Sequence, residues 1–159
     1  MSDVLQALYR GDRDEAERLA AGRELSVFEA AALGRDDRVR ELLDEDPGLA
    51  NAFAEDGFHP LGLACFFGNV EAARALVDAG ADVNALSRNE RIQTAAIHAA
   101  AAAEGKDGET TRYELVELVL DHGADPNLEQ AGGFRAIDAA RQNGDTRVEA
   151  LLLERGATG

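Results

Sequence analysis

The side chains best suited to catalysis or metal binding are three histidines and one cysteine, namely His59, His98, His122 and Cys65. A metal site needs several ligands at short, regular spacing, and no cysteine, aspartate or histidine partner stands at such a spacing from any of the histidines. A nucleophilic cysteine needs a nearby base and an electropositive site, whereas Cys65 stands where the repeats described below have a small buried residue. We therefore expect these side chains to have structural roles, and we expect no catalytic residue, no metal site and no cofactor.

Sequence motifs for phosphate and acyl chemistry are also missing. No Gly-Lys-Ser/Thr phosphate loop, no Gly-x-Ser-x-Gly elbow and no Gly-x-Gly-x-x-Gly turn occurs in the chain. The acidic residues Glu104, Asp107 and Glu109 could suggest calcium, but their spacing is not that of an EF-hand loop and Lys106 would lie among the ligands. We interpret this cluster as part of a surface loop.

Charge and composition limit the classes of partner. The 159 residues include 31 Asp and Glu against 16 Lys and Arg, and the net charge of −15 repels a phosphate backbone, so we expect no nucleic-acid ligand. A single cysteine excludes an intramolecular disulfide and fits a reducing compartment. The N-terminus lacks a secretory signal pattern, and no long apolar run occurs. These features predict a cytoplasmic protein without a membrane segment.

Repeated helix pairs must position these residues. An apolar residue stands seven positions before a glycine in the ranges 4–11, 27–34, 61–68 and 137–144, and each range frames a short helix and its turn. Apolar residues at spacings of three and four follow these turns, as in Val70, Ala73, Leu76 and Val77, and predict a second helix with one buried face. Glycines at 80, 123 and 156 end three of the second helices.

The segments between the pairs carry the motifs of a known family. Residues 80–84 and 123–127 read Gly-Ala-Asp-Val-Asn and Gly-Ala-Asp-Pro-Asn, which resembles the Gly-Ala-Asp-x-Asn that opens the hairpin of ankyrin repeats. Residues 59–64, 95–100 and 135–140 stand where that family has Thr-Pro-Leu-His-x-Ala, although no repeat here keeps the Thr and the His together. The resemblance implies an all-α ankyrin-repeat solenoid of about five helix-turn-helix repeats joined by β-hairpin-like loops.

The repeat spacing predicts one domain over residues 1–159, with repeats at 2–22, 23–53, 54–86, 87–129 and 130–158. The interval is 34 residues from Val27 to Leu61, 36 from Leu61 to Ile97 and 40 from Ile97 to Ile137. We assign the excess in the fourth repeat to an inserted loop at 104–110, between its two helices. The first repeat is too short to include a hairpin and the last has polar residues in place of some apolar ones, so we expect both to be capping repeats of a complete array.

The resemblance also implies a function and a surface. Ankyrin repeat proteins bind partner proteins on their concave side, through hairpin tips and exposed first-helix positions, so we expect a binding module and not an enzyme. Carried over by position, this selects Glu55, Asp56, Phe58, Phe66 and Phe67 in the third repeat, Arg88, Asn89, Glu90 and Arg91 in the fourth, and Phe134, Gln142 and Asn143 in the fifth.

The clustered phenylalanines Phe58, Phe66 and Phe67 suggest the centre of an interface for a protein with a basic or apolar patch. In the other interpretation, one or both of Phe66 and Phe67 turn inward and fill the space left by Gly62.

Two other functions stay open at this point. The same phenylalanines could meet across a two-fold axis, so the chain could be a monomer or a weak homo-oligomer. A small-ligand or enzymatic role would use an acidic groove, in which His59 stands close to Glu55 and Asp56 in sequence.

Overall fold

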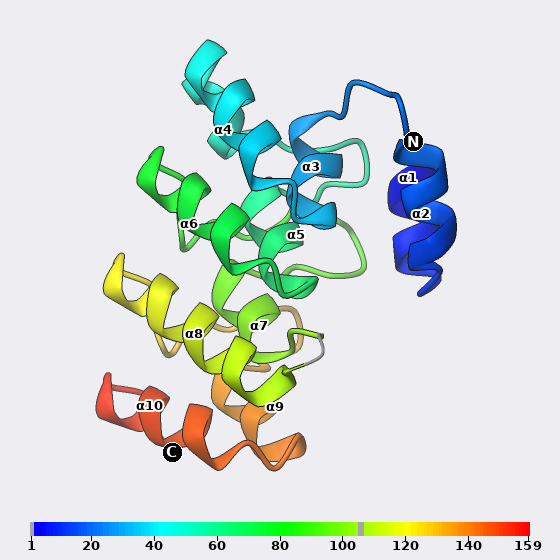
Figure 1. Cartoon of the computed structure of the whole chain (residues 1–159). Coiled ribbons are helices and arrows are strands. Elements are labelled where there is room, and N and C mark those ends of the chain that lie inside the picture. Colours follow the sequence, from blue (N-terminus) through cyan, green and yellow to red (C-terminus); the bar gives the residue numbers. More distant parts are fainter. Residues whose placement is uncertain (1, 105–106) are drawn as a thin grey trace.

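The computed structural model describes residues 2–104 and 107–159, and in these residues ten α-helices form five successive pairs. The pairs are α1 (Asp3–Tyr9) with α2 (Arg13–Ala20), α3 (Val27–Leu33) with α4 (Asp36–Glu45), α5 (Pro60–Phe66) with α6 (Val70–Asp78), α7 (Ala96–Ala101) with α8 (Gly108–Asp121), and α9 (Ala136–Gln142) with α10 (Thr146–Glu154). A short 3₁₀ helix, η1 (Pro47–Asn51), follows α4. The second to fifth pairs stack in one column, with the first helices on one side and the second helices on the other (Figure 1). The expected all-α solenoid is confirmed.

Hairpin loops join the stacked pairs. In the loop before α5, the N–H of Ala54 donates to the carbonyl of Phe58 at 2.9 Å, and in the loop before α9, Gln130 donates to Phe134 at 2.9 Å. No strand is present in the described part of the chain, where the one isolated β-bridge pairs Glu129 with Arg135. The tips of successive loops lie next to one another, since the N–H of Arg88 in one hairpin bonds to the carbonyl of Gly57 in the hairpin before it.

His59 and His98 each bond to a backbone carbonyl of the following loop, although they stand at different positions of the repeat motif. His98, in the first turn of α7, accepts from the N–H of Ala95 at Nδ1 (3.0 Å) and donates from Nε2 to the carbonyl of Leu128 (2.7 Å). His59 precedes α5 and caps it, accepting from the N–H of Gly62 at 2.9 Å and reaching Ala85 O at 3.0 Å.

The two accepting carbonyls are equivalent, since each follows the asparagine of a Gly-Ala-Asp-x-Asn segment. A Cβ on Gly62 would lie 2.9 Å from Cε1 of His59. The glycine therefore makes room for a histidine that has moved three positions along the motif.

Asparagines tie successive loops on the second-helix side of the stack. Each one donates from Nδ2 to a glycine carbonyl of the next loop at 3.0–3.1 Å and accepts a backbone N–H from that loop at 2.7–2.9 Å. These asparagines are Asn51, Asn84 and Asn127, and their acceptor glycines are Gly80, Gly123 and Gly156. Three consecutive junctions therefore carry one pair of hydrogen bonds in the same register.

The first pair does not continue the column. It lies beside α3 and α5 (Figure 1). Tyr9 of α1 contacts Phe58, in the hairpin before α5, and Phe67, at the end of α5. Residues 21–25 form a short link without a hairpin, so no hairpin loop sets α1 and α2 in the register of the later repeats. The first helix pair thus packs against α3 and the third repeat outside the regular stacking of the later pairs.

The inserted stretch 104–110 is a loop only in part. Helix α8 begins at Gly108, so residues 108–110 form its first turn, while Gly105 and Lys106 lie outside the described residues. The N–H of Thr111 donates to the carbonyl of Asp107 at 2.9 Å, and the Arg112 guanidinium pairs with the buried Asp145 carboxylate at 2.8 Å. These contacts stabilise the first turn of α8. The polar sequence predicted a loop for these residues instead of a helical turn.

The histidine arrangement predicts strong coupling between positions 59 and 62. Gly62→His alone should lower the free energy of unfolding by about 1–3 kcal/mol, because its side chain meets the His59 ring. His59→Thr alone should cost about 1–2 kcal/mol, because the Ala85 carbonyl loses its partner. The double variant restores the family's own order and should recover most of that loss, as measured by urea unfolding followed by circular dichroism. Simple additivity of the two single changes would refute this account.

The same bonds predict loss of stability in mild acid. Burial lowers the pKa of both His59 and His98 below the ordinary 6.5. The unfolded chain therefore binds protons first, so the stability given by the neutral rings is complete above pH 6.5 and falls as the pH drops through the lowered values. We expect the free energy of unfolding to decrease between about pH 7 and pH 5, and to decrease less in His98→Asn. Equal slopes for both proteins would contradict the prediction.

Candidate functional site

The hairpin tips of the third and fourth repeats are locked together. The N–H of Arg88 donates to the carbonyl of Gly57 at 2.7 Å, and the side chain of Asn89 donates to the carbonyl of Asp56 at 2.7 Å. Gly57 has a φ of 87°, and a Cβ there would lie 2.4 Å from the backbone nitrogen of Asn89. The two tips thus form one continuous edge that needs glycine at this crossing.

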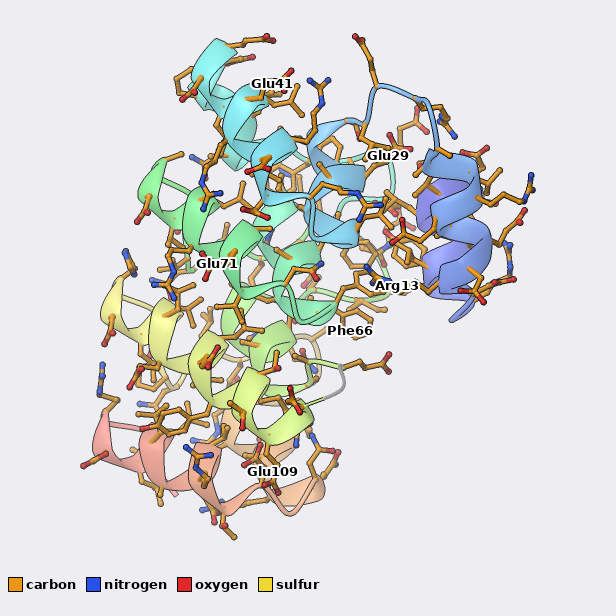
Figure 2. All side chains as sticks on the ribbon, in the orientation of Figure 1. Arg13, Glu29, Glu41, Phe66, Glu71 and Glu109 are labelled. Atoms are coloured by element: carbon orange, nitrogen blue, oxygen red, sulfur yellow. The ribbon has the colours of Figure 1, made fainter. Side chains whose placement is uncertain are left out.

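The aromatic cluster of the third repeat is partly covered by the chain itself. The rings of Phe58 and Phe67 are half-buried, and each lies against Tyr9 of α1, with centroid distances of 6.1 and 6.3 Å. Phe66 meets Phe67 edge-on at 5.1 Å and stays 39% exposed. Figure 2 shows Phe66 at the end of α5, on the side that faces the first helix pair. The space at Gly62 is taken by the His59 ring and not by a phenylalanine.

Tyr9 is a member of this cluster that sequence reasoning missed. Its hydroxyl donates to the Asp56 carboxylate at 2.9 Å, and Asp56 also accepts from the N–H of Phe58 at 3.3 Å. Partial burial and the neighbouring Asp56 carboxylate raise the pKa of Tyr9 above its ordinary value of 10.0, while the residue stays 40% exposed. Sequence position gave no signal for this contact, because Tyr9 and Asp56 belong to different repeats without regular stacking.

The fourth hairpin combines a rigid frame with exposed side chains. Asn89 Oδ1 accepts the backbone N–H groups of Arg91 and Ile92, both at 3.0 Å, so its role is to shape the tip. The guanidinium of Arg88 lies 3.9 Å above the ring of Phe53, while Glu90 and Arg91 are exposed.

Ile92, at 52% exposed, was also missed in the sequence. An apolar residue within the polar run 87–94 was the available signal.

The predicted residues of the fifth repeat separate into two kinds. Phe134 is half-buried and packs against the core, so it supports the hairpin before α9. Gln142 and Asn143, at the end of α9, are exposed. Glu55 of the third repeat is exposed at its hairpin tip. The structure thus brings Asp56, Phe58 and Phe67 together around Tyr9, with Phe66 against Phe67. The other predicted residues lie along the same hairpin and first-helix side.

The groups with potential chemistry are engaged in the framework. Burial raises the pKa of the Cys65 thiol to about 12, which leaves it without the thiolate that a nucleophile needs. His122 donates from Nδ1 to the carbonyl of Leu118 at 2.8 Å, at the end of α8. Within the described ranges, no three of the His, Cys, Asp and Glu side chains are grouped so that they could hold a metal ion. No helix in the described part of the chain is long and apolar enough to cross a membrane.

Two shallow clefts open beside the hairpins. One of about 290 Å³ lies between α1 and the hairpin before α5, with Leu5, Phe28 and Asp56 among its lining residues. The other, of about 440 Å³, lies between the hairpins before α5 and α7 and includes Phe53, His59 and Leu86. Both are partly apolar and lie on the edge that carries the predicted contact residues.

Comparison with known proteins extends these observations. A family model described as ankyrin repeats (3 copies) matches residues 27–130, a range that begins at α3 and leaves out α1 and α2. Ankyrin repeat and SAM domain-containing protein 6 of Rattus norvegicus is 29% identical over 127 residues, which cover 80% of this chain and 13% of the relative.

Two further relatives show the same partial coverage. Ankyrin repeat, SAM and basic leucine zipper domain-containing protein 1 of Dasypus novemcinctus is 34% identical over 119 residues, or 75% of this chain and 24% of the relative. Serine/threonine-protein kinase VIK of Arabidopsis thaliana is 35% identical over 85 residues, or 54% of this chain and 17% of the relative. The chain thus spans less than a quarter of these curated relatives. With the family model covering most of the stacked repeats, the chain belongs to the ankyrin repeat family.

Proposed function

We propose that this chain is a non-catalytic protein-binding module that holds a partner protein against the hairpin tips and first helices of its third to fifth pairs. Ankyrin repeats generally mediate protein–protein interaction, and the family is generally non-catalytic. The observation that carries the proposal is the exposure of Phe66 and Ile92, two large apolar side chains on this side of a rigid frame. Apolar anchors in such positions are the usual centres of binding energy in an interface.

The remaining contact residues follow from exposure. Polar and charged side chains would form the rim around the apolar anchors, and they are Glu55, Arg88, Glu90, Arg91, Gln142 and Asn143. Asn89 and Phe134 would act through the shape of their hairpins, because their side chains are engaged in the frame. Asp56, Phe58 and Phe67 would meet a partner only where Tyr9 leaves them accessible.

The charge of the chain suggests the kind of partner. A net charge of −15 attracts a protein with a basic patch and speeds the encounter between the two. A buried thiol and the lack of a second cysteine fit a cytoplasmic setting. The proposed partner is therefore a cytoplasmic protein with a basic rim around an apolar patch.

A variant with both anchors removed should lose the partner. Phe66→Ala combined with Ile92→Ser should weaken capture by at least about thirtyfold, because even one central anchor contributes about 2 kcal/mol or more. The measurement is affinity capture from a lysate of the source organism with tag-immobilised protein, followed by quantitative mass spectrometry. Both positions are exposed, so the variant should keep its fold, which circular dichroism would verify.

Leu153→Ala provides the matched control for this experiment. Leu153 is 45% exposed on α10, a second helix on the opposite side of the column, so its loss should leave capture unchanged. Equal retention of a specific protein by wild type and the double variant would refute the assigned surface. A shift of the wild type to a dimer in light scattering, abolished in the double variant, would favour self-association through the same anchors.

Salt should slow binding if the acidic surface steers the partner. Raising the ionic strength from about 0.05 to 0.5 M should lower the association rate constant about tenfold and change the dissociation rate much less, because screening acts mainly on the encounter. Surface plasmon resonance with the captured partner would measure both constants. An association rate independent of salt would contradict a basic partner.

A further inference from the structure

The first helix pair occupies a well-defined seat on the third repeat. The Tyr9 ring lies parallel to Phe67, with an interplanar angle of 19°, and meets Phe58 edge-on. Its hydroxyl donates to Asp56 at 2.9 Å. These three residues of the third repeat thus form a receptor for one phenol: an aromatic floor, an aromatic wall and a carboxylate. We call Asp56, Phe58 and Phe67 the tyrosine seat.

The connection between this pair and the column is weaker than the other junctions. The three junctions between stacked loops each have an asparagine that bonds to the next loop, but residues 20–25 contain no asparagine to make this contact. The pair is held by the buried Leu5 and Leu8 of α1 and by the ring contacts of Tyr9. Its polar ties include Ser2 to Glu29 at 2.7 Å, Arg13 to the carbonyl of Leu33 at 3.0 Å, and the Arg35–Glu17 ion pair. Exposed ion pairs contribute little to stability.

The two helices of the first pair are also packed as one unit. Helices α1 and α2 bury Val4, Ala7, Ala16 and Ala20, and they pack mainly on each other. A segment with its own internal packing can detach from the column as a unit. The free energy of that detachment is expected to be lower than the free energy of unfolding the stacked repeats.

We infer that α1 and α2 are a displaceable occupant of the tyrosine seat, and that the partner of this surface is an amphipathic helix that places a tyrosine there in place of Tyr9. This inference rests on the proposed function and specifies the partner. A phenylalanine would fill the same space but leave the Asp56 carboxylate without the phenol donor, so the seat favours tyrosine. The cleft of about 290 Å³ beside the seat, lined by Leu5, Phe28 and Asp56 among others, offers room for a larger apolar side chain next to that tyrosine.

The test uses the full chain and a peptide of its own residues 2–23, labelled with a fluorophore. In the wild type, α1 and α2 belong to the same chain as the tyrosine seat and therefore compete with the peptide at high effective concentration. Tyr9→Ala weakens the binding of α1 and α2 to the seat. We expect the peptide to bind the Tyr9→Ala chain about tenfold more tightly than the wild type, because one charge-assisted hydrogen bond and one ring contact hold the resident tyrosine. A peptide with phenylalanine at its own position 9 should bind this variant about tenfold more weakly than the unmodified peptide.

Controls separate the seat from general changes in the fold. The only other tyrosine is Tyr113, which lies on α8 beneath Arg147. A Tyr113→Ala chain should bind the peptide as tightly as the wild type does. Amide hydrogen exchange on the full chain should show α1 and α2 exchanging faster than α5 to α8, and faster still in Tyr9→Ala. Tyr9→Phe serves as a second, milder variant if Tyr9→Ala perturbs the fold.

Two results would overturn the inference. One is equal peptide binding, or none, in the wild type and both Tyr9 variants; the other is exchange in α1 and α2 as slow as in α5 to α8. The outcome is independent of the Phe66 and Ile92 capture experiment. If the peptide binds as expected but the Phe66 and Ile92 double variant still captures the partner, the tyrosine seat stands and the proposed anchor surface is rejected. If the peptide does not bind as expected but the double variant loses the partner, the anchor surface stands and the tyrosine seat is rejected.

Discussion

The structure depends most on side chains that satisfy the backbone groups of the next repeat. A buried carbonyl without a partner costs about 1–3 kcal/mol, and hairpin loops expose many such groups toward their neighbours. His59 and His98 satisfy one carbonyl each, and Asn51, Asn84 and Asn127 satisfy a carbonyl and an N–H each. Because a solenoid has only contacts between neighbours, these bonds set the register in which hairpin tips and first helices line up as one surface.

The same constraint explains why the N-terminal pair lies elsewhere. Between Gly22 and Ser26 the chain has no room for a hairpin, so no loop brings an asparagine or histidine to the second repeat. Helices α1 and α2 still have an apolar face to bury, with Val4, Leu5 and Leu8 inside. They pack against α3 and against the phenylalanines of the third repeat. The contact that results covers part of the surface expected for a partner.

Local patterns predicted most of the fold and only part of the site. Apolar spacing and glycine positions were enough for five helix pairs, because each pair is a local unit whose helix faces and turns are visible in about thirty residues. The docking of Tyr9 on Phe67 joins residues far apart in the sequence and has no periodic signature. The 104–110 stretch looked like a loop from its polarity, but Arg112 and the buried Asp145 extend α8 into it. The sequence shows that the third repeat has a histidine at position 59 and a glycine at position 62, where the family motif has histidine. Only the structure shows that His59 makes the same bond to the next loop as His98.

The roles of the titratable groups favour recognition over chemistry. A general base must hold a proton acceptor ready for substrate, yet both ring nitrogens of His59 and of His98 are hydrogen-bonded to the backbone. Asp56 accepts from Tyr9 and from the backbone, so its carboxylate orients a phenol instead of activating a water. The exposed side chains on the hairpin side include Tyr9, Phe66, Leu86 and Ile92 together with charged hairpin residues, a combination of apolar anchors and a polar rim. This surface is therefore suited to recognition, and the contacts of Tyr9 with Asp56, Phe58 and Phe67 show how a phenol fits on it.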